Sequence, residues 1–182
     1  MANFYEIELK SVLSEDKYSQ LMRDAPGKMK LVQKVLVHNM LFSPGHHALK
    51  MNGADDLEYV VKKSCGLMCN DVYRENITQA GYIELAQQLN REKIKVREWG
   101  AGKFIFEHPL DDHVYKVYIE AILVPGIYVP AAYVLKARHE SGSMGIDEHV
   151  LKLRRIMVSL GVTPVPARQF DEKLKSSIIN RK

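Results

Sequence analysis

The sequence has few of the features that mark disulfide-rich, metal-binding and membrane proteins. Only two cysteines, Cys65 and Cys69, occur in 182 residues. Their spacing is not that of a Cys-x-x-Cys redox motif, and we interpret them as reduced thiols. No apolar run approaches the roughly 18–20 residues of a membrane-spanning helix. The first ten residues contain no apolar signal segment, so we expect a cytoplasmic protein without a membrane partner.

The chain also lacks a strong excess of charge of one sign. Its 26 Lys and Arg residues exceed its 22 Asp and Glu residues, which gives a net charge of +4. This mild basicity favours small anionic ligands and does not predict a DNA-binding protein. Hydrophobic residues make up 46% of the chain. We therefore expect one globular domain over residues 1–182, as a monomer or homodimer.

The hydrophobic pattern predicts many short strands and a few helices. Alternation with a period of two is typical of strands and predicts them at 4–10, 34–42, 46–51, 57–63, 71–77, 92–98, 103–107, 113–123 and 129–138. Apolar residues at helical spacing predict helices at 14–25, 78–90, 147–160 and 167–177. Gly100 and Gly102 predict a turn between two strands. This order of elements predicts an α+β protein built on an antiparallel barrel or sandwich.

The first predicted strand contains the most informative motif of the chain, Glu6-Ile-Glu8-Leu-Lys10. Alternating side chains point to opposite faces of a strand, so Glu6, Glu8 and Lys10 share one face and Ile7 and Leu9 share the other. A charged row of this kind is also typical of a strand whose outer face is solvated. The motif alone leaves both interpretations open.

Later strands repeat the same division into a charged and an apolar face. The basic residues at these strand positions are Lys62, Arg74, Lys93, Lys95, Arg97, Lys136 and Arg138. Such rows can face water on the outside, or they can line a polar tunnel whose apolar side is covered by helices. A tunnel of Lys and Arg would bind a polyanion, and its paired carboxylates could hold a divalent metal.

The motif Glu6-x-Glu8-x-Lys10 resembles the ExExK signature of the CYTH, or triphosphate tunnel metalloenzyme, superfamily, which includes class IV adenylyl cyclases, thiamine triphosphatases and RNA triphosphatases. Further segments resemble the family in order along the chain. They are Lys50 in HALKM, Lys62 in LEYVVKK, Tyr73-Arg74-Glu75, Lys95-Val96-Arg97, and the ending from Leu160-Gly161 to Phe170 and Leu174.

The resemblance implies an eight-stranded antiparallel barrel or tunnel with helices packed outside. It also implies a site that binds a nucleotide or polyphosphate together with Mg²⁺ or Mn²⁺. Glu6, Glu8 and Lys10 are then the expected catalytic residues, and Glu6, Glu8 and Glu120 the expected metal ligands. The expected phosphate-binding residues are Lys50, Lys62, Arg74, Lys93, Lys95, Arg97, Lys136 and Arg138.

The sequence departs from the family pattern in one late strand. The family usually has a second acidic pair there, whereas this chain has Lys136 and Arg138. The departure favours anion binding over metal binding. Three functions therefore stay open: a metal-dependent triphosphatase or nucleotidyl cyclase, a tunnel protein that binds or sequesters a nucleotide without turnover, and an RNA- or protein-binding domain with external charged faces.

Overall fold

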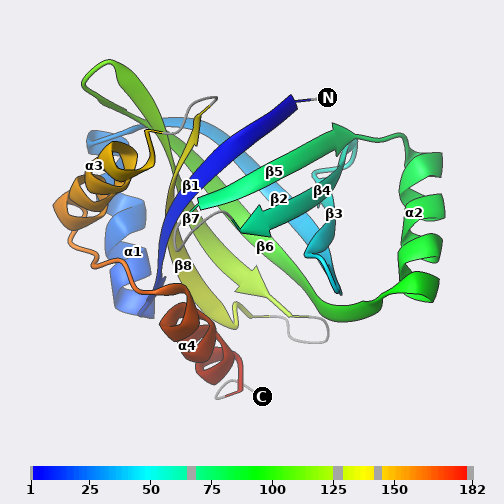
Figure 1. Ribbon diagram of the computed structural model, residues 1–182. Coiled ribbons are helices and arrows are strands. Elements are labelled where there is room, and N and C mark those ends of the chain that lie inside the picture. The colour runs from blue at the N-terminus through cyan, green and yellow to red at the C-terminus, as the bar shows by residue number, and fades with distance from the viewer. Residues whose placement is uncertain (1, 65–68, 125–128, 142–144, 180–182) are drawn as a thin grey trace.

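Strands dominate the computed structural model, which describes residues 2–64, 69–124, 129–141 and 145–179. Within these ranges eight strands form a closed antiparallel barrel (Figure 1). The strands are β1 (Ala2–Leu13), β2 (Lys30–Ser43), β3 (His47–Asn52), β4 (Asp56–Ser64), β5 (Cys69–Asn76), β6 (Ile94–Leu110), β7 (His113–Leu123) and β8 (Ala132–Ser141). The helices are α1 (Glu15–Asp24), the short 3-10 helix η1 (Ala25–Gly27), α2 (Gln79–Glu92), α3 (Ile146–Ser159) and α4 (Ala167–Ile179). The predicted fold class is confirmed.

The strand order around the barrel is β1-β5-β4-β3-β2-β6-β7-β8, and β8 pairs with β1 to close it. The turn predicted at Gly100 and Gly102 is wrong, because β6 runs through both glycines. Gly100 pairs with His38 of β2 on one side and Leu123 of β7 on the other, so its backbone belongs to the sheet. A Cβ atom at Gly100 would lie 3.5 Å from the carbonyl oxygen of Val37, which shows how closely the strands approach there.

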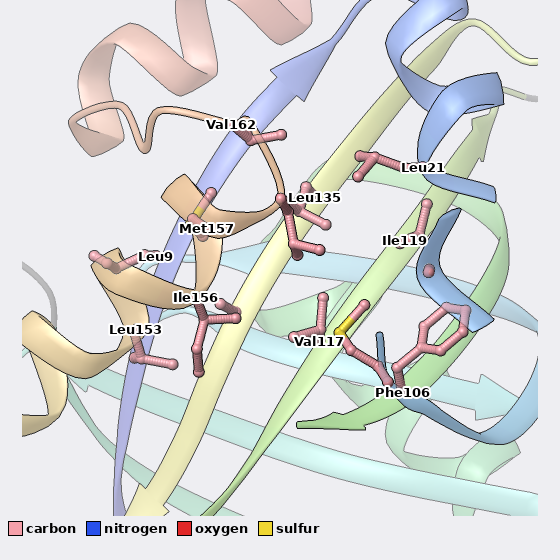
Figure 2. Packing of buried hydrophobic residues seen from close by; sticks show 14 of the residues in the cluster. Leu9, Leu21, Phe106, Val117, Ile119, Leu135, Leu153, Ile156, Met157 and Val162 are labelled. Atoms are coloured by element: carbon pink, nitrogen blue, oxygen red, sulfur yellow. The ribbon is translucent and has the colours of Figure 1, made fainter. Parts of the chain in front are cut away.

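The main hydrophobic core lies outside the barrel, between the sheet and helices α1 and α3. Figure 2 shows Leu9 of β1, Leu135 of β8 and Ile119 of β7 facing Leu21 of α1 and Ile156 of α3. Each of these side chains is buried, and burying one contributes about 1.5–3 kcal/mol. The apolar face of β1 therefore packs under helices, and its charged face must turn to the barrel interior.

Two more helices cover other parts of the barrel. Helix α2 packs Leu89 against Phe42 and Leu49 on the outer side of β2 and β3. Helix α4 covers one end of the barrel, where Phe170 and Leu174 contact an apolar layer of interior-facing residues. That layer consists of Val37, Ala101, Ile122, Ala132 and Val134. No helix in the described ranges is long and apolar enough to cross a membrane.

Three histidines form a cluster on the outer side of the sheet under α3. The ring of His139 stacks on that of His149 with centroids 4.0 Å apart, and the ring of His113 lies 5.0 Å from His149. Tyr115 Oη lies 2.9 Å from His149 Nδ1. Burial lowers the pKa of both His139 and His149; His149 and His113 lower that of His139 further, and His113 lowers that of His149 further.

We expect this histidine cluster to make the protein less stable in mild acid. The unfolded chain takes up protons at His139 and His149 below a pH of about 6.5, before the folded chain does. Stability is thus fully present above that pH and is lost below it. His139→Phe keeps a stacking ring, removes the charge, and should reduce the fall in Tm between pH 7.5 and 5.5. Circular dichroism melts against the exposed control His46→Gln measure this. An equal fall in both variants contradicts the prediction.

Candidate functional site

The charged faces of the strands meet inside the barrel. Strand pairing places Glu8 beside Arg138, Lys10 beside Lys136, Lys50 beside Glu58, and Lys103 beside Glu120. The interior-facing cations include Lys10, Lys50, Lys62, Arg74, Lys103, Lys136 and Arg138, and the interior-facing carboxylates include Glu6, Glu8, Glu58, Glu120 and Glu140. The interior is therefore polar and strongly charged, with more cations than carboxylates among these described residues.

Arg138 of β8 joins Glu6 and Glu8 of β1 in one ion-pair network. Its Nη1 lies 3.1 Å from Glu6 Oε2, and its Nη2 lies 3.0 Å from Glu8 Oε2. The guanidinium also stacks over the ring of Tyr118, 4.8 Å from its centroid. Lys62 makes a further ion pair with Glu6. Burial would raise the pKa of Glu6, but Arg138 and Lys62 hold it below its ordinary value, so Glu6 is ionised although it is fully buried.

A second network surrounds Glu120 of β7. Lys136 Nζ lies 2.8 Å from Glu120 Oε2, and Lys103 Nζ lies 3.5 Å from Glu120 Oε1. Burial would raise the pKa of Glu120, but the two lysines lower it, and Glu120 in turn raises the pKa of Lys136. Burial lowers the pKa of Lys103, and Glu120 opposes that shift, so the carboxylate favours the charged form of both lysines.

Lys50 differs from these cations. It makes no ion pair or hydrogen bond with any described residue, although it faces the same interior. Burial, followed by the charges of Lys62 and Arg138, lowers the pKa of Lys50 to about 7. Arg138 Nε is also buried without a hydrogen-bond acceptor in the described chain. The interior therefore contains donor groups whose hydrogen-bonding capacity is unused.

Solvent reaches these charged groups, so the site is not a sealed core. The side chain of Lys62 is 27% exposed and that of Lys136 is 20% exposed. Glu120, by comparison, is 2% exposed. These lysine side chains are thus partly accessible, whereas Glu6 and Glu120 are almost fully buried.

The structure brings most of the predicted site residues together. Those that share the interior are Glu6, Glu8, Lys10, Lys50, Lys62, Arg74, Glu120, Lys136 and Arg138. Lys103 was not predicted as a site residue. Alternation along the strand places it on the face opposite to the apolar Phe104, and this signal could have identified it. Glu58 and Glu140 were also missed. For these residues, the alternative interpretation as a solvated outer face is therefore wrong.

Lys93 and Lys95 do not join this group, and the prediction that they share a face with Arg97 is wrong. Lys93 is the C-cap of α2 and donates to the carbonyl oxygen of Pro44 at 3.0 Å. Lys95 pairs with Phe42, whose side chain packs outside under α2, and Lys95 Nζ lies 2.6 Å from Glu98.

The physical reason is an irregularity in the pairing of β2 with β6. Arg97 pairs with Leu41 and Lys95 pairs with Phe42, so one extra residue of β6 lies between two adjacent residues of β2. A bulge of this kind breaks the alternation of faces along the strand. Arg97 pairs with Leu41, so it lies on the face of β6 that is turned to the barrel interior. It makes no ion pair with a described interior residue.

The arrangement of carboxylates does not fit a resident divalent metal. Among the described residues, no group of three His, Cys, Asp or Glu side chains is placed to hold a metal ion. The predicted ligands Glu6, Glu8 and Glu120 each contact at least one Lys or Arg instead. In particular, the guanidinium of Arg138 lies between Glu6 and Glu8, where a shared metal would have to lie.

Comparison with known proteins identifies the fold and not a close relative. No family model and no curated protein matches the sequence. The structure resembles the PH1012 protein of Pyrococcus horikoshii OT3, with a TM-score of 0.66 and 13% identity over 87% of this chain and 91% of that one. It also resembles bh2851 of Bacillus halodurans, a proposed adenylate cyclase, with a TM-score of 0.60 and 12% identity over 92% and 95%.

A third similar structure is HpAC1 from Hippeastrum, a proposed adenylyl cyclase with a dominant triphosphatase activity. Its TM-score is 0.56, and its identity is 12% over 90% of each chain. Identities this low establish the fold alone. The chain thus has the CYTH-like fold that the ExExK motif predicted, an antiparallel barrel with a charged interior.

Proposed function

We propose that the barrel interior binds a phosphate-rich anion such as inorganic triphosphate or the triphosphate of a nucleotide. The observation that carries this proposal is the set of interior cations from several strands, among which Lys50 and Arg138 Nε have no acceptor within the described chain. Phosphate oxygens are strong acceptors for such donors. The triphosphatase activity named for HpAC1 supports the same class of ligand.

The ion pairs hold the interior cations in ordered positions before a ligand arrives, although their carboxylates also occupy donors that the ligand would use. Glu6 fixes Lys62 and Arg138, and Glu120 fixes Lys103 and Lys136. Long side chains that are already ordered lose less entropy when they bind a ligand. A phosphate chain would meet a preformed array and not a set of mobile lysines.

Turnover is a separate hypothesis. Hydrolysis or cyclisation with Mg²⁺ or Mn²⁺, with Glu6, Glu8 and Lys10 as catalytic residues, stays a prediction from the family resemblance. Because the carboxylates are engaged by cations, the geometry supports binding better than metal-assisted chemistry. Phosphate and cyclic nucleotide release from ATP and triphosphate, with each metal and with Glu6→Gln as the control, measures turnover directly.

We expect Lys62→Met to weaken triphosphate binding by at least about tenfold, because one charge-assisted hydrogen bond contributes about 1.5–3 kcal/mol. Lys63→Met is the matched control. Lys63 is the next residue of β4, and it is exposed on the opposite face of the strand. Isothermal titration calorimetry with inorganic triphosphate and with ATP gives both affinities. Equal losses in the two variants, or no binding by the wild type, would contradict the proposal.

A further inference from the structure

We infer that Glu6, Glu8 and Glu120 are internal counter-ions of the barrel, and that a phosphate ligand binds by taking their place at the cations without a divalent metal. This inference rests on the proposed function and assigns roles to the carboxylates of the same site. It departs from the expectation that the ExExK strand binds Mg²⁺ or Mn²⁺.

The position of Arg138 is the first argument. Its two Nη atoms contact one oxygen of Glu6 and one of Glu8, at 3.1 and 3.0 Å, so the guanidinium bridges the two carboxylates. A metal bound by the same two oxygens would need that position. An arginine side chain does not lose its proton in a protein, so Arg138 keeps its positive charge and its ion pairs with both carboxylates. The bridge between Glu6 and Glu8 is therefore filled by a permanent cation that belongs to the chain.

Glu120 supplies the second argument, from another part of the interior. It lies between Lys136 at 2.8 Å and Lys103 at 3.5 Å, which come from two different strands. A divalent metal such as Mg²⁺ requires several oxygen ligands, and Mg²⁺ prefers six. Here one carboxylate faces two ammonium groups. Its surroundings would repel a metal ion and would attract a second anion.

The charge of the whole interior is the third argument. Cations outnumber carboxylates among the interior-facing described residues, and Lys50 makes no ion pair within the described chain. A metal ion would add positive charge to this excess, whereas a triphosphate would neutralise it. Phosphate oxygens and carboxylate oxygens accept from the same Lys and Arg donors, so the ligand and the carboxylates compete for them.

This competition predicts the sign of a mutational effect. If Glu120 is a counter-ion, Glu120→Gln frees Lys103 and Lys136 for the ligand, and triphosphate should bind about three- to tenfold more tightly. If Glu120 is a metal ligand, the same change weakens binding in Mg²⁺. Glu98→Gln is the matched control because Glu98 also pairs with a lysine, Lys95, but on the outer side of the barrel. Its affinity should equal that of the wild type.

The test is calorimetric titration of inorganic triphosphate into the full chain, once in EDTA and once in MgCl₂, followed by titration of MgCl₂ alone. We expect binding in EDTA, tighter binding by Glu120→Gln, weaker binding in MgCl₂ because the metal chelates the free ligand, and no heat of binding with MgCl₂ alone. Glu8→Gln is the second variant, with the same expected direction, should Glu120→Gln fail to fold.

Two results overturn the inference in different ways. Binding in MgCl₂ but not in EDTA, or a loss of affinity in Glu120→Gln, would leave the phosphate site standing and make the carboxylates metal ligands. Absence of triphosphate binding under both conditions would instead remove the proposed function, and the inference with it.

Discussion

Replacing Arg138 with methionine is expected to lower the Tm by about 10 °C and to abolish triphosphate binding. The substitution leaves Glu6 and Glu8 without their shared guanidinium, and Glu6 is fully buried. Removing one partner of a buried ion pair costs about 3–5 kcal/mol. Each kcal/mol corresponds to about 2–4 °C in a chain of this size. Thermal unfolding followed by circular dichroism measures the stability loss.

A double variant separates the loss of the ion pair from the loss of side-chain volume. Arg138→Met with Glu8→Gln removes one of the two carboxylate charges that lose this guanidinium and should recover part of the lost Tm. Triphosphate binding should stay absent, because the donor groups of Arg138 are still missing. Arg154→Met on the exposed face of α3 is the control and should change neither quantity. An unchanged Tm in Arg138→Met would show that the network does not stabilise the fold.

Replacing Lys50 with methionine should have opposite effects on stability and binding. Below its pKa of about 7, Lys50 carries a charge inside the barrel without an ion pair in the described chain. Methionine removes that charge, and we expect the Tm at pH 6 to rise by about 3–6 °C, or about 1.5 kcal/mol. Triphosphate affinity at pH 6 should fall about tenfold, because a charged donor is lost.

The pH dependence follows from the same lysine. The folded pKa of Lys50 is lower than its unfolded value, so the folded chain holds fewer protons between pH 7 and about 10.4 and gains stability as the pH rises through that range. Lys50 is charged below pH 7 and neutral above it, so triphosphate affinity should fall between pH 6 and 8.5.

Burial is the main cause of the lowered pKa of Lys50, and several charged groups modify it. Lys62 and Glu58 of β4, Arg138 of β8 and Glu6 of β1 act on it through their charges. Lys50→Met should not show the fall in triphosphate affinity between pH 6 and 8.5, because methionine carries no titrating group at this position. Lys63→Met, on the outer face of β4, should keep the pH dependence of the wild type. An identical pH profile in wild type and Lys50→Met would exclude Lys50 from the site.

Much of the barrel could be predicted from the sequence because alternation is a local property. Glu6, Glu8 and Lys10 share a face on any extended strand, and Ile7 and Leu9 share the other. Which face is inside is not a local property. It depends on closure of the sheet and on α1 and α3 covering the apolar side, and both involve residues far apart in the chain.

The failures have the same origin. The bulge that separates Lys95 from Arg97 arises where β2 pairs with β6, and the paired residues lie more than fifty positions apart in the sequence. The local sequence of β6 therefore did not predict it. Gly100 and Gly102 indicate a turn by composition, but two neighbouring strands hold them in the sheet. The bridging role of Arg138 likewise depends on the pairing of β1 with β8, since Glu8 and Arg138 lie 130 residues apart.

The most direct test of a metal-free phosphate site is a crystal structure of the protein with inorganic triphosphate, grown in EDTA. We predict phosphate density inside the barrel, in contact with Lys50, Lys62 and Arg138, and a rearranged Glu120 side chain. A second crystal grown with MnCl₂ should show no anomalous peak between Glu6 and Glu8. Phosphate density outside the barrel near Lys93 and Lys95, or a manganese peak between Glu6 and Glu8 with Arg138 displaced, would contradict this account.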